Sequence, residues 1–418
     1  MARNASRTGH NVRCMSAETV ECRRGRWKGR PACFLRNDII SLTHLTGGGQ
    51  IPDLHFLDAP TLNPFWIPRW KLRDPSLFRP TRDEANFGPA PEGKLLCGIA
   101  GHSLCLGVFG MPSEEEIAAG AVLHGEAGVR SWAASFRSSQ NHGCLRFTVR
   151  LPGAGLVFTR ELSLRPGESV VRVRGSVRNL LAADQFIQWQ QHAVLGLPFL
   201  HRNHCIITLP GLHGITDSGN YEGRPALASD AEFSWPFAPG IEGAPVDLQH
   251  PCQKSGAGFV AGVQLDPRRE HAFVCAVNSA HRLAIGYVFR RSRFPWVTLW
   301  EENHARRQPP WRGREQTRAF EFGVSPLPFG RKAAMHWGER WGTPALVRLP
   351  AQGVIAASYA LFLSRLPRGI RRINDVTFSP DHLTLHVESR TPLQLAAAGL
   401  PELLGHENVP AASSQARS

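Results

Sequence analysis

The sequence predicts an all-β protein, in which mostly antiparallel strands form a large sandwich with few short helices. Two observations lead to this fold class. Apolar and polar residues alternate with a period of two in several segments, which is typical of strands with one buried face. In addition, 40 Gly and 32 Pro interrupt a chain of 418 residues, and this frequency suits many short strands joined by turns.

The alternation locates individual strands. It is clearest in residues 169–179, where Val171 and Val173 are expected to face the core and the intervening arginines to face outward. Residues 145–151 and 383–387 repeat the pattern with leucine, valine and phenylalanine on one side. Each of these segments is predicted to be a half-buried strand.

Helical signal is sparse. A capping box begins at Ser113, where the side chains of Ser113 and Glu116 can bind each other's backbone amides ahead of Ile117 and Ala118. The motif predicts one short helix.

The composition indicates a single folded unit. Residues 1–36 are strongly basic and are expected to form a flexible tail, whereas residues 391–418 become rich in Ala, Ser and Pro and are expected to be a loose tail. Between them, residues 37–390 show no break in composition and are predicted to form one β-sandwich domain.

The formal net charge of +14 first suggests a nucleic-acid partner. However, residues 1–36 contain nine basic and two acidic side chains, so +7 of the excess lies in the expected tail. The other +7 is spread over residues 37–418, and Arg290–Arg293 with the Arg306–Arg314 cluster is the best local candidate for a basic face. The charge therefore does not require a nucleic-acid partner, and none is predicted.

Neither a membrane span nor a secretory signal is expected, because no apolar run approaches about 18 residues. Nine scattered cysteines without a C-x-x-C pair favour free thiols in a reducing compartment. The sequence thus predicts a soluble, cytoplasmic protein.

No metal or cofactor is predicted. Gly47–Gly49 lacks the Lys-Ser/Thr of a phosphate-binding loop and is expected to be a turn with positive φ. His201 and His204 are the closest histidine pair of interest, but no third ligand follows at a diagnostic spacing.

Three segments place a titratable side chain in an apolar strand or at its end. His124 follows an apolar run and precedes a glycine, His192 precedes a Gly-x-Pro sequence, and Glu321 lies between Phe320 and Phe322. Burial between two phenylalanines is expected to raise the basicity of the Glu321 carboxylate.

In this order, the three segments resemble the galactose mutarotase (aldose 1-epimerase) superfamily, and more narrowly its uncharacterised bacterial branch. Asn37–Leu42 leading into Gly47–Ile51 is similar to the opening strand pair of that family, and Glu161–Asn179 is similar to its middle section. The resemblance extends over roughly residues 35 to 390.

The resemblance implies a β-supersandwich that interconverts sugar anomers without a cofactor. In the family, a Glu deprotonates the anomeric hydroxyl and a His protonates the ring oxygen. Carried over to this sequence, the resemblance assigns Glu321 as the base and His192 as the acid. It leaves His124 to hold a neighbouring oxygen or to share the protonation.

The substrate would be a small-molecule sugar, and the side chains expected to bind it combine aromatic and polar groups near these positions. They are Trp189, Gln191, Trp300, Glu301, Arg307 and Trp311. Trp66, Trp70 and Lys71, in a loop interrupted by proline, are expected to cover the mouth of the site.

Two other functions remain open at the level of sequence. The same fold could bind carbohydrate without catalysis. Alternatively, Glu321 could act with Glu301 or Glu302 as a pair of carboxylates that hydrolyses glycosides.

Overall fold

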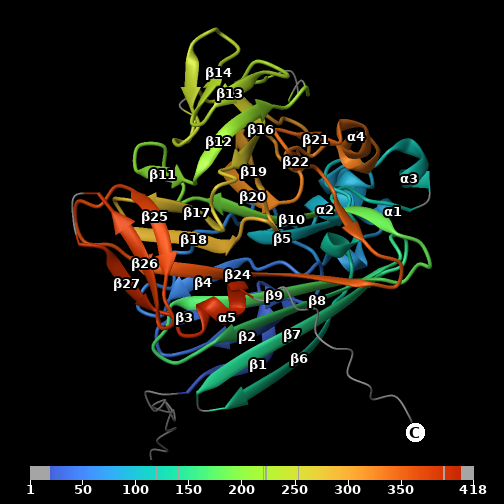
Figure 1. Cartoon of the computed structure of the whole chain (residues 1–418). Helices are drawn as coiled ribbons and strands as arrows, with labels where there is room; N and C mark the ends of the chain where they lie inside the picture. The colour runs from blue at the N-terminus through green and yellow to red at the C-terminus, as the bar shows by residue number, and fades with distance from the viewer. Residues whose placement is uncertain are drawn as a thin grey trace, which may run out of the picture.

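The computed structural model describes residues 19–405, except 119, 140, 220, 222, 223, 253, 389 and 390. Two large antiparallel sheets form the body of the structure (Figure 1). The predicted all-β fold is confirmed, and the strands expected at residues 145–151, 169–179 and 383–387 all form.

The first large sheet has ten strands and carries the site described below. Its order is β15-β14-β13-β12-β16-β19-β20-β10-β23, with β5 pairing to β10 off this path. Its members are β5 (His102–Gly107), β10 (Gln185–Gly196), β12 (Gly211–Thr216), β13 (Glu232–Ser234), β14 (Phe237–Pro239), β15 (Pro245–Asp247), β16 (Ala257–Leu265), β19 (Trp296–Asn303), β20 (Gln316–Gly323) and β23 (Val347–Leu349).

The second large sheet has eight strands in the order β11-β17-β18-β24-β9-β8-β7-β6. Its members are β6 (Ala133–Ser139), β7 (His142–Leu151), β8 (Leu156–Leu164), β9 (Val170–Asn179), β11 (Cys205–Thr208), β17 (His271–Asn278), β18 (Leu283–Arg290) and β24 (Val354–Arg365). In β9, Val171 and Val173 are buried as predicted, but Arg172 is buried as well because it pairs with Glu168 at 2.6 Å.

The N-terminal basic segment is partly folded, which corrects the boundary expected from composition. A four-stranded sheet contains β1 (Glu21–Trp27), β2 (Arg30–Arg36), β3 (Ile40–Leu45) and β4 (Asp53–Phe56). Cys33 and Leu35 are buried in the main core, and the Arg30 guanidinium donates to the carbonyls of Gly98 and Gly47. The basic side chains of this segment therefore belong to strands, and β2 has one face buried in the core. Residues 1–18 lie outside the described part.

The C-terminal segment also differs from the expected loose tail. A three-stranded sheet joins β25 (Ile373–Phe378), β26 (His382–Val387) and β27 (Leu393–Ala396), and α5 (Leu400–Gly405) follows it. Leu400, Leu403 and Leu404 are buried in a second core against β17, β18 and β24. These leucines lie among alanines and glycines, so the overall composition of residues 391–418 gave no sign of a short apolar helix.

The remaining elements are short. They are two 3-10 helices, η1 (Pro75–Leu77) and η2 (Glu126–Val129), the helices α1 (Pro80–Phe87), α2 (Glu92–Leu96), α3 (Glu114–Ala118) and α4 (Gly330–Trp337), and the strands β21 (Glu339–Arg340) and β22 (Thr343–Pro344). The predicted capping box is present at α3, where Ser113 N donates to Glu116 Oε2 at 3.0 Å and Glu116 N donates to Ser113 Oγ at 3.3 Å. Among the described residues, no helix is long and apolar enough to cross a membrane.

The main core lies between the two large sheets, and the strands β16, β19, β20 and β10 contribute alternate side chains to it. Leu299 from β19 and Phe320 and Phe322 from β20 belong to this core. The residues between them point to the other face of the sheet, where α1 and α2 lie beside it (Figure 1). That second face carries the titratable side chains considered next.

Candidate functional site

His192 and Glu321 are direct cross-strand partners on the neighbouring strands β10 and β20. Directly opposed residues in an antiparallel pair point to the same face, so the ladder itself brings the two side chains together. His192 Nε2 lies 3.6 Å from Glu321 Oε1, and the two side chains are only 5% and 3% exposed. Two residues that are 129 positions apart in the sequence thus form one buried acid-base pair.

His124 lies beside this pair, in a turn rather than on a strand. Its φ of +61° and the φ of +80° at Gly125 turn the chain sharply. Gly110 N donates to His124 Nδ1 at 3.1 Å, so the neutral ring carries its proton on Nε2. The rings of His124 and His192 are 5.4 Å apart. The structure therefore brings together all three titratable residues expected from the sequence.

These residues line a cavity of about 280 Å³, hereafter the cleft. Trp300 from β19, Trp311 from the following loop and Val260 from β16 form part of its wall, and Leu95 and Leu96 of α2 form another part. Trp311 is stacked on Trp66, with ring centroids 5.8 Å apart and an interplanar angle of 5°. The cleft thus combines indole surfaces with an acid-base pair.

Burial sets the protonation of the pair. Desolvation raises the pKa of Glu321 well above its usual value of 4.5 and lowers the pKa of His192 to about 4. Burial also lowers the pKa of His124 well below its ordinary value. These shifts favour a protonated Glu321 facing a neutral His192. Transfer of that one proton would give a carboxylate and an imidazolium.

Several buried polar atoms in the lining have no hydrogen-bond partner among the described residues, Nδ1 of His192 among them. Two others are Oε2 of Glu321 and Nε1 of Trp311. An unpaired buried polar atom costs about 1–3 kcal/mol. A ligand with hydroxyl groups could satisfy both atoms, since a hydroxyl donates as well as accepts.

Trp189 and Gln191 do not reach the cleft, which corrects two of the expected substrate contacts. Both have the opposite strand parity to His192 and therefore point into the main core. The Trp189 ring packs edge-on against Phe158 and Phe294. Because both faces of β10 are buried at this point, the alternation that would have distinguished them is absent from the sequence.

Gln191 instead joins a polar network in the core. Its Oε1 accepts from Tyr359 Oη at 3.2 Å and lies 3.1 Å from His102 Nε2 and 3.5 Å from a terminal nitrogen of Arg160. Arg160 is fully buried and also donates to the carbonyl of Gly49. The role of Gln191 in this structure is therefore to satisfy other buried groups.

Glu301 also points away from the cleft, again because of strand parity. It is the cross-strand partner of Arg318, with Arg318 Nη1 3.0 Å from Glu301 Oε2, and its other oxygen accepts from Cys252 N at 2.7 Å. Glu302 has the correct parity but is already engaged, since it accepts from Tyr221 Oη and from the amides of Ala305 and Arg306. Neither carboxylate is available in the cleft as a second acidic group beside Glu321.

Arg307 is exposed and does not line the cleft, whereas the adjacent Arg306 does. The Arg306 guanidinium lies over Trp311 at 5.0 Å and over Tyr221 at 5.2 Å from the ring centroids. Both arginines follow β19 in a loop without periodicity, so the sequence held no signal to choose between them. Contacts from α2 were likewise missed, because nothing in the sequence links residues 92–96 to β10.

The histidines that the structure describes do not form a metal site. In the part of the chain that the structure describes, no group of three or more His, Cys, Asp or Glu side chains could hold a metal ion. His201 and His204 stack at 4.9 Å in a turn, without a third ligand in that part. The eight cysteines within the described residues are free thiols.

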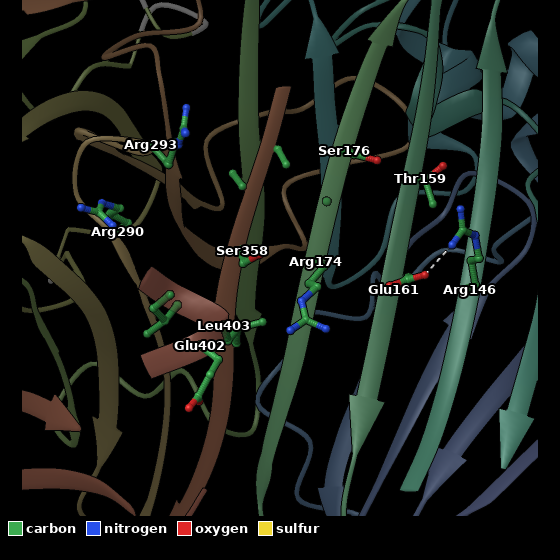
Figure 2. A pocket seen from close by; sticks show the side chains of 14 residues that line it. Arg146, Thr159, Glu161, Arg174, Ser176, Arg290, Arg293, Ser358, Glu402 and Leu403 are labelled. Carbon is green, nitrogen blue, oxygen red and sulfur yellow. Dashed lines mark hydrogen bonds and ion pairs between the residues drawn. The ribbon is translucent and has the colours of Figure 1, made fainter. Parts of the chain in front are cut away.

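Another cavity, of about 200 Å³, lies over β7, β8 and β9 beside α5 (Figure 2). It is lined by arginines and hydroxyl groups, and Arg146 and Glu161, which lie side by side on β7 and β8, form an ion pair of 2.6 Å. No histidine lines this cavity, and neither Glu161 nor Glu402 is buried. It offers no acid-base pair comparable to that in the cleft.

Comparison with solved structures identifies the class of fold. An aldose 1-epimerase from Klebsiella pneumoniae, assigned as such only provisionally, matches with a TM-score of 0.59 at 14% identity, over 81% of each chain. A galactose mutarotase-like protein from Clostridium acetobutylicum matches with a TM-score of 0.56 at 12% identity, over 83% of this chain and 99% of the other.

The chain therefore has a galactose mutarotase-like fold, as the sequence resemblance implied. The sequence matches no protein-family model, and no curated protein is significantly similar to it. At 12–14% identity, the structural similarity establishes the fold, and the activity has to be argued from the cleft.

Proposed function

We propose that the protein is a cofactor-independent isomerase of the aldose 1-epimerase type, which interconverts the anomers of a sugar bound in the cleft. The observation that carries the proposal is the buried pair of Glu321 and His192, 3.6 Å apart and walled by Trp300 and Trp311. Indole rings suit the apolar faces of sugars, and an acid next to a base suits a reaction that moves one proton off and another on.

The proposed reaction is balanced within this pair. The Glu321 carboxylate takes the proton of the anomeric hydroxyl, the bond from C1 to the ring oxygen breaks, and the His192 imidazolium donates a proton to that oxygen. Rotation about C1–C2 exposes the other face of the aldehyde. The reverse steps then close the ring and restore both groups.

The electrostatics of the cleft support this cycle. After ring opening, the pair consists of a protonated Glu321 and a neutral His192, which is the state that burial favours. Bound hydroxyl groups would stabilise the charged starting state, because a carboxylate that accepts hydrogen bonds has a lower pKa. His124, with its Nε2–H proton, would hold a neighbouring sugar oxygen.

Anomer exchange in a panel of aldoses, followed by saturation-transfer NMR and by polarimetry, tests the proposal. We expect the wild-type protein to accelerate exchange for at least one sugar, and Glu321→Gln and His192→Gln each to reduce kcat/KM by about 10²–10⁴-fold. Glu388→Gln, at an exposed carboxylate outside the cleft, is the control and should retain full activity.

Two outcomes would contradict the proposal in different ways. Sugar binding without accelerated exchange would favour a non-catalytic binding module on the same fold. Release of reducing sugar from glycosides would favour hydrolysis and would require a second carboxylate besides Glu321.

A further inference from the structure

A second pocket, which we call the basic pocket, adjoins the cleft behind its tryptophan wall. It has a volume of about 300 Å³ and is lined by five basic side chains, Arg69, Lys71, Arg73, Arg312 and Arg314, with Glu315 as its one carboxylate. These residues follow Trp66 and Trp311 in the sequence. Trp311 lines the cleft and Trp66 is stacked on it, so the basic residues lie in the loops that supply this stacked pair.

The positive charge in the basic pocket is largely uncompensated. Glu315 is only 3% exposed, and its two oxygens accept from Trp66 Nε1 at 2.9 Å and from the backbone amide of Arg69 at 3.0 Å. Arg73 lies 3.6 Å from Asp83, a carboxylate that it shares with Arg82. Within the described residues, the side chains of Arg69, Lys71, Arg312 and Arg314 form no ion pair.

In the cavity near α5, by contrast, two of the four lining arginines have a carboxylate partner. Arg146 pairs with Glu161 on the neighbouring strand (Figure 2), and Arg290 lies 3.3 Å from Glu270. Four unpaired cations around one pocket repel one another, and a bound anion would relieve that repulsion.

The basic pocket and the cleft share a thin partition. Trp70 lines the basic pocket and Trp311 lines the cleft, and their rings meet edge to face at 5.2 Å. Trp70 Nε1 donates to the carbonyl of Leu96, whose side chain lies in the cleft wall. A ligand that occupies both cavities would thus have to pass over the place where these two rings meet.

We infer that the substrate is an acidic saccharide, whose reducing sugar occupies the cleft while a carboxylate, sulfate or phosphate on its distal part occupies the basic pocket. This inference rests on the proposed function for the reducing end and adds the chemical class of the substrate. Arginine is suited to the distal contact, since its planar fork binds each of these anions through two hydrogen bonds. A confined pocket favours a single anionic group over the extended basic face that nucleic acid requires.

Isothermal titration calorimetry with matched ligands tests the inference. The pairs are cellobiouronic acid with cellobiose, and glucose 6-phosphate with glucose, each at about 20 mM and about 200 mM NaCl. We expect the acidic member of at least one pair to bind about tenfold more tightly at low salt, with the preference reduced at high salt.

The variant Arg69→Gln/Arg314→Gln should abolish this preference and leave the affinity for the neutral ligand unchanged. The control is Arg150→Gln/Arg178→Gln, which removes the same charge at exposed positions of β7 and β9 outside both cavities. Equal affinity for the acidic and neutral members of both pairs would overturn the inference, as would an identical loss in the control. Binding of oligothymidylate alone, lost in Arg69→Gln/Arg314→Gln, would overturn it in favour of nucleic acid.

The outcome is separable from that of the proposed function. Accelerated anomer exchange without a preference for acidic ligands would contradict the role inferred for the basic pocket and would support the proposed isomerase activity. Preferential binding of an acidic saccharide without accelerated exchange would support the role of the basic pocket and contradict the isomerase activity.

Discussion

Glu321 shows how a single residue links chemistry to stability. Its carboxyl group is buried beside a histidine and has one oxygen without a partner within the described structure. The folded protein must keep a proton on this group or carry a buried charge, so its pKa is raised. The function proposed for the cleft thus places a pH-dependent cost on the fold.

That cost can be measured. For a carboxyl group with a raised folded-state pKa, the stabilising contribution is fully present below the unfolded value of about 4.5 and is lost as pH rises toward the folded value. We therefore expect the free energy of unfolding of Glu321→Gln, measured by urea denaturation, to increase relative to that of wild type as the pH is raised from 5 to 8. No such relative increase is expected for Glu388→Gln. A difference between Glu321→Gln and wild type that is constant with pH would contradict the assigned shift.

At the scale of the element, strand parity decides which side chains reach the cleft. In β19, Trp300 lines the cleft and Glu301 is buried on the other face against Arg318. Alternation identified β7, β9 and β26 from the sequence because one face of each is largely exposed or polar. Alternation could not assign the faces of β10 and β19, because both faces of these strands are buried and apolar and polar residues do not alternate along them. The sequence therefore singled out the titratable residues that line the cleft, because they stand out in apolar strands. It wrongly placed their neighbours Gln191 and Glu301 in the cleft as well.

The parity of β19 leads to a prediction with a matched control. Glu301→Gln breaks a buried cross-strand pair and leaves Arg318 without its carboxylate, so we expect it to lower the free energy of unfolding by about 3 kcal/mol. Glu161→Gln breaks the cross-strand pair with Arg146, which is largely exposed, and should cost less than about 1 kcal/mol. Urea denaturation measures both, and neither should change kcat/KM of the folded protein. A loss of activity in Glu301→Gln without a loss of stability would return Glu301 to the list of catalytic candidates.

On the scale of the whole molecule, the ends of the described chain are structural. The four-stranded N-terminal sheet contributes Leu35 to the main core, and α5 closes the second core over the eight-stranded sheet. Net charge and composition could not reveal this, because they average over windows in which a few buried residues are decisive. The central domain could be predicted because the alternating pattern recurs in many strands along the chain.

Truncation tests the assignment of the C-terminal segment. Removing residues 391–418 deletes β27 and the buried leucines of α5, each worth about 1.5–3 kcal/mol, so we expect a loss of at least about 4 kcal/mol in the free energy of unfolding. Removing only residues 406–418 takes away none of these buried side chains and should leave Tm nearly unchanged. Equal Tm values for the two truncations would show that α5 does not contribute to the second core.

The two faces of β10 also constrain how such a protein can diverge. A one-residue insertion within the strand would exchange His192 with its neighbours, and it would disrupt both the cleft and the polar network around Gln191. The tryptophan-bearing loops at residues 66–73 and 306–315 lie outside the large sheets. An insertion in one of these loops would therefore not shift the side chains of β10. Descendants of this chain could therefore acquire new ligand preferences by changing those loops, while the inherited acid-base pair stays fixed in the sheet.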